Sequence, residues 1–155
     1  MIINFSKYHG TGNDFIIIDN RSLKLNPKTE WIKKLCHRRF GIGADGIMLL
    51  EKSGDHDFSM KYYNADGNEG TMCGNGGRCI VAFANSLGII KSSAKFTAID
   101  GEHSAEILKN DKNACLIDLQ MQDVEDIKIY NNNYFINTGS PHYVTFVENL
   151  ENIDV

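Results

Sequence analysis

One cysteine of this sequence stands among residues that suit a chemical role. Glycines and small polar residues surround Cys73 between Asn64 and Arg78, and an apolar run after it predicts a helix over 75–87. At a helix N-terminus the dipole favours a thiolate, and the free N–H groups of Gly74 and Asn75 could hold a carboxylate. The pattern therefore predicts a reactive thiol beside an anion site, although a structural cysteine in a tight turn explains these residues equally well.

The other three cysteines are predicted to be core residues. Each lies within an apolar helix or strand pattern, where cysteine behaves as a small hydrophobic residue. They are Cys36, Cys79 and Cys115. The sequence has no CxxC pair and too few cysteines for a secreted disulfide scaffold, so we expect free thiols.

The histidines leave one alternative open. A cysteine hydrolase would need a histidine base near Cys73, and His9 or His142 could approach it in the fold. Both histidines stand in turns rich in Gly, Ser or Pro, where ordinary loop roles explain them about as well. The adjacent Cys36 and His37 have no second ligand pair at zinc spacing, so the sequence predicts no metal site.

Residues 41–46 match the GxGxxG fingerprint of dinucleotide binding, but in a reversed context. The fingerprint requires a strand before it and a helix after it. Here a predicted helix precedes the glycines and a predicted strand follows them. We expect a helix-to-strand turn and no nucleotide cofactor.

Hydrophobic periodicity predicts two helices in a strand-rich chain. The first helix begins at Asn26-Pro27 and ends near Arg39, with Trp31, Ile32 and Leu35 on one face. The second helix, 75–87, is apolar on almost every side. Short strands are expected at 2–7, 14–19, 47–51, 58–64, 95–99, 104–108, 114–119, 127–130, 134–137 and 142–147. Because most strands follow one another directly, we predict an α+β fold of mostly antiparallel strands wrapped around a buried central helix.

The composition excludes several functional classes. Hydrophobic residues at 42% and charged residues at 23% are typical of a globular protein. The net charge of -4, without a basic cluster, argues against nucleic acid as a partner. No apolar run approaches the ~20 residues that span a bilayer, and the first residues lack signal-peptide features, so we expect a cytoplasmic protein with no membrane partner.

Several separated motifs resemble those of the diaminopimelate epimerase family. The family's H-G-x-G-N-D-F, G-I-G-x-D, N-A-D-G and C-G-N-G-x-R-C stand here in order at 9–15, 41–45, 64–67 and 73–79. The resemblance implies a pyridoxal-independent enzyme that interconverts LL- and meso-diaminopimelate, on the route to lysine and peptidoglycan, with no cofactor. It makes Cys73 an acid/base catalyst. It also assigns contacts with this small-molecule substrate to Asn13, Asn64, Gly74 and Asn75.

The same resemblance implies two pseudo-symmetric halves, each with one catalytic cysteine. It places an amino-terminal half at 1–115 and the opening strands of an incomplete second half at 116–155. The second catalytic cysteine lies in a later region of the family that nothing here matches, so we expect little or no epimerase activity from this chain alone. Homodimers are common among the proteins that it resembles.

Two positions depart from the family pattern, and two other functions stay open. Ser140, in a Gly-Ser-Pro-His segment similar to the family's G-N-P-H, stands where many members have a substrate-binding Asn, and Gly46 stands where some have Gln. Neither contact can therefore be transferred. The alternatives are a related two-half racemase or isomerase of another amino acid, such as proline or hydroxyproline, and a noncatalytic amino-acid-binding module in which Cys73 is structural.

Overall fold

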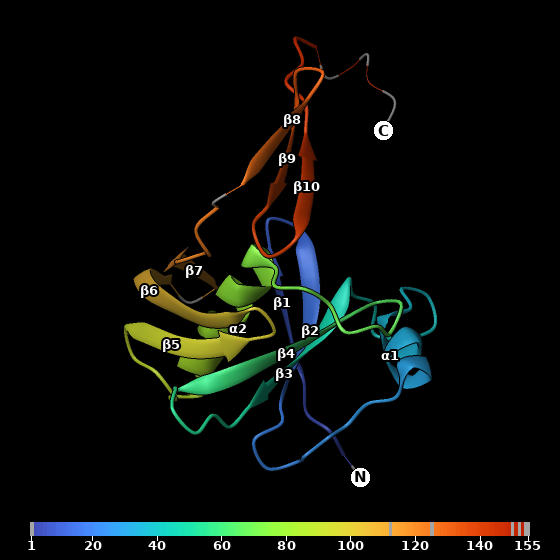
Figure 1. Ribbon diagram of the computed structural model, residues 1–155. Helices are drawn as coiled ribbons and strands as arrows, with labels where there is room; N and C mark the ends of the chain where they lie inside the picture. Colours follow the sequence, from blue (N-terminus) through green and yellow to red (C-terminus); the bar gives the residue numbers. More distant parts are fainter. Residues whose placement is uncertain (1, 112, 125, 150, 152, 154–155) are drawn as a thin grey trace. The chain divides into compact units, whose positions relative to one another are not determined.

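The structure is a computed structural model that describes residues 2–111, 113–124, 126–149, 151 and 153. The chain forms two compact units, Met1–Gln120 and Met121–Val155 (Figure 1). Within the described part of the chain, no helix is long and apolar enough to cross a lipid bilayer.

The first unit is built on one sheet whose strands follow the order of the sequence. They are β1 (Ser6–Gly10), β2 (Asn13–Asp19), β3 (Gly46–Glu51), β4 (Phe58–Asn64), β5 (Ser93–Ala98), β6 (Gly101–Asp111) and β7 (Ala114–Leu119). Neighbouring strands are antiparallel except β2 with β3 and β4 with β5, which are parallel. Parallel neighbours need a long crossover, and the two helices α1 (Thr29–Cys36) and α2 (Gly74–Ser86) lie in these two connections.

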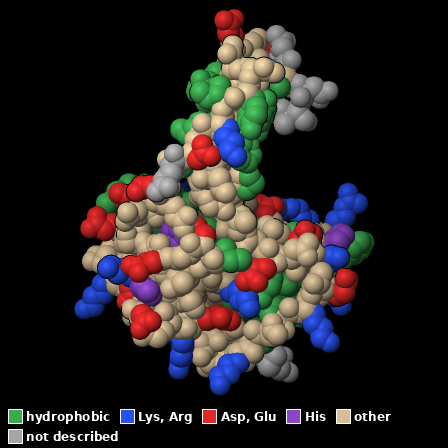
Figure 2. Space-filling model, viewed as in Figure 1, with side chains coloured by type: hydrophobic (Ala, Val, Ile, Leu, Met, Phe, Trp, Pro, Cys, Tyr) green, Lys and Arg blue, Asp and Glu red, His purple; other side chains and the backbone are tan. Residues whose placement is uncertain are grey.

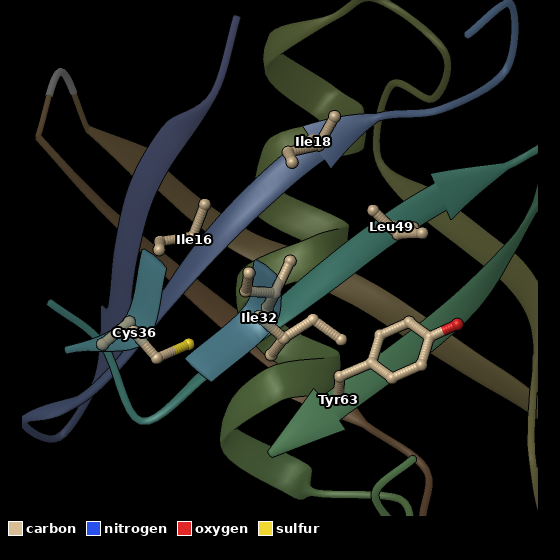
Figure 3. Close-up of a cluster of buried hydrophobic side chains, with 8 residues drawn as sticks. Ile16, Ile18, Ile32, Cys36, Leu49 and Tyr63 are labelled. Atoms are coloured by element: carbon tan, nitrogen blue, oxygen red, sulfur yellow. The ribbon is translucent and has the colours of Figure 1, made fainter. Parts of the chain in front are cut away.

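The central strands β2 and β3 are buried on both faces, which explains their continuous apolar runs. On one face, alternate residues of β2 and β3, together with Tyr63 of β4, pack against Ile32 and Cys36 of α1 (Figure 3). On the other face, a Cβ added to Gly76 of α2 would lie 3.2 Å from the sulfur of Met48 and 3.5 Å from Met60. The two helices therefore cover opposite faces of the sheet.

Helix α2 is the centre of the first unit. It packs against β1, β2, β3, β6 and β7, so the sheet curves around it (Figure 1). Its buried side chains form a broad face, Cys79, Ile80, Val81, Phe83 and Ala84, while Arg78, Ala82 and Asn85 on the other side are half-buried. The predicted α+β fold, with mostly antiparallel strands around a buried central helix, is confirmed.

The second unit is a small antiparallel sheet in the order β10-β9-β8. Its strands are β8 (Ile127–Tyr130), β9 (Asn133–Asn137) and β10 (Pro141–Val144). Many of its apolar side chains face solvent, and Figure 2 shows hydrophobic side chains along it. In the same view of the first unit, acidic and basic side chains are interspersed.

Several predicted element boundaries are wrong, among them both ends of β6, which is predicted over 104–108 and spans 101–111. Pairing of β1 begins at Ser6 rather than at residue 2, and Ile3 packs against the cluster on the α1 side. Helix α1 is shorter than predicted and ends before His37, whose Nδ1 accepts the N–H groups of Arg39 and Phe40, each at 3.1 Å, in a turn. The last strand, predicted over 142–147, ends at Val144.

The predicted division at residue 115 concerns the halves of a larger fold and stays a prediction. Within this chain, β7 pairs with β6 and belongs to the first unit.

Candidate active site

The Cys73 thiol stands at the N-terminus of α2, as the sequence predicts. Cys73 is the N-cap residue with an extended backbone (φ -119°, ψ 120°), and its carbonyl accepts the N–H of Gly77 at 2.8 Å. The side chain is half-buried. Gly74 and Asn75 form the first helical positions, where no carbonyl of a preceding turn is available to their N–H groups. The partly accessible thiol of Cys73 therefore stands beside the backbone N–H donors of the first turn of α2.

A turn after β4 brings Cys73 to this position. The N–H of Gly70 binds the carbonyl of Tyr62 at 2.9 Å, so the chain folds back along β4 before it enters α2. A Cβ on Gly70 or on Gly46 would lie 2.4 Å from the Tyr62 ring, so only glycine fits on either side of this ring. Burial, followed by the nearby Cys73, raises the pKa of Tyr62 to about 12. The Tyr62 side chain is therefore uncharged at neutral pH and lies near the thiol.

Three of the predicted substrate-binding residues meet at Cys73. The sulfur lies 3.6 Å from Oδ1 of Asn13, and the same oxygen accepts Nδ2 of Asn75 at 3.4 Å. Gly74, the first residue of α2, lies between Cys73 and Asn75, which make these contacts. Gly10 permits the close approach of β1, because a Cβ there would lie 3.1 Å from Cβ of Asn75.

The fourth predicted residue, Asn64, lies at the end of β4, on the same edge of the sheet. Its register partner is Gly46, which pairs in turn with Phe15 near the start of β2. Its Nδ2 is 3.2 Å from the place of a Cβ on Gly70, beside the turn that leads to Cys73. The structure places Asn64 next to the group of three without a contact to the sulfur among the interactions described.

A charged cluster supports the site, and sequence reasoning missed it. Oδ2 of Asp45 accepts Nδ2 of Asn13 at 2.8 Å and the N–H of Asp14 at 3.2 Å. Arg38 joins the two carboxylates, at 2.7 Å from Asp45 and 2.8 Å from Asp14. Lys7 binds Asp14 at 2.6 Å and also donates to the carbonyl of Gly43. The signal in the sequence is Asp45, the Asp of the G-I-G-x-D motif, but no local pattern indicates which residue it binds.

The same contacts keep both carboxylates ionised. The hydrogen bond from Asn13, ahead of those from Asp14 and Arg38, lowers the pKa of Asp45 below its usual value. The hydrogen bond from Arg38, together with Lys7, holds the pKa of Asp14 well below its usual range. Burial opposes both shifts without cancelling them. At neutral pH Asp45 therefore offers Asn13 acceptors only.

The other cysteines differ from Cys73. Cys36 and Cys79 are buried as predicted, and burial raises the pKa of Cys36 to about 11 and that of Cys79 to about 12. Cys115 corrects the prediction of a core position. It is only half-buried, because β7 is an edge strand, and it lines a cleft of about 780 Å³ between β1 and β7. Burial also raises its pKa.

The remaining sequence candidates have local roles. The glycine-rich segment 41–46 is a helix-to-strand turn as predicted, since the N–H groups of Ile42 and Gly43 return to the carbonyl of Leu35. His9 accepts the N–H of Gly12 at 3.4 Å within its own turn. His142 lies in the second unit and contacts Thr138 at 3.1 Å.

Solved structures share this fold. A PhzF-family phenazine biosynthesis protein of Bacillus anthracis superposes with a TM-score of 0.69 at 17% identity, over 96% of this chain and 56% of that protein. Methylitaconate-delta-isomerase gives a TM-score of 0.56 at 14% identity, over 88% of this chain and 71% of that one. At these identities the likeness shows the fold alone.

Sequence comparison is more specific. The diaminopimelate epimerase of Flavobacterium psychrophilum is 60% identical over 151 residues, which are 96% of this chain and 57% of the relative. That of Chlorobaculum tepidum is 45% identical over 150 residues, 94% of this chain and 58% of the relative. The chain thus spans less than two thirds of the length of these relatives. The family model described as diaminopimelate epimerase matches residues 5–125, so the chain belongs to the diaminopimelate epimerase family.

Proposed function

We propose that this chain supplies one of the two acid/base residues, Cys73, of an epimerase that interconverts LL- and meso-diaminopimelate without a cofactor. The observation that carries the proposal is the thiol at the N-terminus of α2, beside the first-turn N–H groups of Gly74 and Asn75. The family match and the names of the similar proteins support the choice of substrate.

The helix N-terminus suits the most difficult requirement of the reaction. Removal of an α-proton leaves negative charge that spreads onto the substrate carboxylate, and no imine is present to accept it. Backbone N–H groups and the helix dipole directed at that carboxylate stabilise the charge where it develops. We assign the carboxylate to Gly74 and Asn75, and further polar contacts of this small-molecule substrate to Asn13 and Asn64.

The second base of the proposed reaction is not one of the other cysteines of this chain. Inversion by two bases requires a thiolate on one face of the α-carbon and a thiol on the other. Cys36 and Cys79 are buried thiols with raised pKa values, and Cys36 packs on the α1 side of the sheet. Cys115 stands on β7 without the glycine-rich helix start that surrounds Cys73. We therefore expect this chain alone to show little or no turnover.

The test is a substrate panel with the complete protein that contains this chain. LL-diaminopimelate, proline and hydroxyproline are offered to the wild type, Cys73→Ala and the control Cys115→Ala, and epimerisation is followed by chiral chromatography. We expect turnover of diaminopimelate only, a loss of about 10²- to 10⁴-fold or more in kcat for Cys73→Ala, and near-normal rates for Cys115→Ala.

Other results would point to the alternatives. Turnover of proline or hydroxyproline in place of diaminopimelate would indicate a related racemase. Binding of diaminopimelate without turnover by the wild type would indicate a noncatalytic module. Two further parts of the proposal, a cytoplasmic location and a homodimer of the complete protein, rest on composition and on the family resemblance.

A further inference from the structure

We propose that Asp45 is a positioning residue that fixes the orientation of the Asn13 amide, so that its carbonyl oxygen faces the Cys73 thiol. The inference rests on the proposed function, because it gives Asp45 a role at the catalytic sulfur. It starts from the observation that Asn13 lies between Asp45 and Cys73, with Nδ2 at 2.8 Å from the carboxylate and Oδ1 at 3.6 Å from the sulfur.

The orientation of the Asn13 amide follows from the hydrogen-bonding capacity of the charged groups at the two ends of the series Asp45, Asn13, Asn75 and Arg78. An ionised carboxylate can only accept, so Asp45 must face the NH₂ group of Asn13, which turns the oxygen toward Cys73. At the other end, Arg78 can only donate, and it donates to Oδ1 of Asn75. The NH₂ group of Asn75 is therefore directed at the same oxygen of Asn13, at 3.4 Å. Both amides have one satisfied orientation.

Asp45 is itself held in place. Its Oδ2 also accepts the N–H of Asp14 at 3.2 Å, and its Oδ1 accepts Arg38 at 2.7 Å. These contacts come from β2 and from the turn after α1, so the carboxylate is fixed by two elements. A neutral residue at position 45 would weaken the preference, because an Asn there could present either a donor or an acceptor to Asn13 and only the Asn75 contact would still favour one orientation.

The consequence for Cys73 has a definite sign. An oxygen that faces the sulfur accepts a hydrogen bond from the thiol and stabilises the protonated form, whereas an NH₂ group there would stabilise the thiolate. In the Asp45→Asn variant the Asn13 amide loses the carboxylate that accepts its NH₂ group, and only the longer contact from Asn75, at 3.4 Å, still favours the original orientation, so the turned amide becomes populated. The midpoint of the pH profile for reaction of Cys73 with iodoacetamide should then move down by about half to one pH unit.

The experiment measures that profile by mass spectrometry of tryptic peptides. Cleavage after Lys61 and Arg78 gives a peptide, 62–78, whose only cysteine is Cys73. The variants are Asp45→Asn and, as a matched control, Asp14→Asn, which removes the same charge from the same cluster without touching the Asn13 side chain. Asp45→Glu, which keeps an acceptor-only group, should restore a profile closer to that of the wild type.

A double-mutant cycle separates orientation from simple loss of charge. In an Asn13→Leu background there is no amide to turn, so Asp45→Asn should no longer move the midpoint. The same shift in both backgrounds, or an equal shift for Asp14→Asn, would overturn the proposal and leave a charge effect only. Because alkylation needs no substrate, failure of this inference is distinct from failure of the proposed epimerase activity.

A measurement on the wild type keeps the proposal testable if Asp45→Asn does not fold. In a ¹⁵N-resolved NOE spectrum, the side-chain NH₂ protons of Asn13 should lie close to the backbone N–H of Asp14 and give no strong cross-peak to the β-protons of Cys73. The reverse pattern would contradict the assigned orientation.

Discussion

The sulfur of Cys73 receives two opposing local influences. The N-terminus of α2 stabilises negative charge, and Oδ1 of Asn13, 3.6 Å away, accepts a hydrogen bond from the neutral thiol. An acid/base catalyst must take up and release a proton in each cycle, and a strong preference for either form would slow one direction. We infer that the site balances these influences, with Asn13 as the group that adjusts them.

The charged residues beneath Asn13 predict a pH dependence of stability. The pKa of Asp14 is lower in the folded protein than its ordinary value of 3.8, because Arg38 and Lys7 bind the carboxylate. The resulting stabilisation is complete above the unfolded pKa and is lost as the pH falls toward the folded one. Asp14→Asn should cost about 0.5–1 kcal/mol at pH 7, since the pairs are partly open to water.

Urea unfolding of wild type and Asp14→Asn at pH 7, 4, 3 and 2 checks this expectation. The difference in free energy of unfolding should be largest at pH 7, already smaller at pH 4, and should shrink further at pH 3 and pH 2, because the unfolded carboxyl takes up its proton around pH 3.8. A difference that stays constant down to pH 2 would show that ionisation of Asp14 contributes nothing.

At the level of elements, the site depends on close approaches that glycines allow. The turn into α2 and the start of β3 both contact the Tyr62 ring, through Gly70 and Gly46. The end of β1 approaches Asn75 through Gly10. These contacts join β1, β3, β4 and α2 at the edge of the sheet where Cys73 stands, so a single methyl group there should disturb the arrangement.

Gly46→Ala tests the closeness of this packing. The added Cβ would lie 2.4 Å from both the Tyr62 ring and the carbonyl of Tyr63, so strand β4 must shift. We expect a loss of about 1–3 kcal/mol in the free energy of unfolding. Gly54→Ala is the matched control, because a Cβ at Gly54 meets nothing within 4 Å, and it should change stability by about 0.5 kcal/mol or less. Equal stability of the two variants would contradict the packing described.

Local patterns predicted the elements well and their long-range contacts poorly. The start of α2 after Cys73 was predictable, because an apolar run and its glycines lie within one short segment. The contact between Asp45 and Asn13 was not, since it joins residues 32 apart through the parallel pairing of β2 with β3. Cys115 was misplaced for a similar reason: a strand pattern does not show that β7 forms an edge.

For the whole molecule, the first unit contains Cys73, its amide neighbours and the charged cluster that supports them. The chain nevertheless spans only 57% and 58% of two similar epimerases. Among its other thiols, Cys36 and Cys79 are buried and Cys115 lies half-buried on the edge strand β7. We therefore propose that this chain provides one side of a two-base site and that catalysis requires the complete protein.

Solvent-deuterium exchange by the complete protein tests this proposal most directly. With LL-diaminopimelate in D₂O, early product should carry deuterium at the inverted α-carbon, while recovered substrate keeps its proton, because a different base acts on each face. Cys73→Ala should abolish the incorporation, and Cys115→Ala should leave it unchanged. Early product that retains the original proton, or deuterium incorporation that persists in Cys73→Ala, would contradict the assignment of Cys73 as one of two catalytic bases.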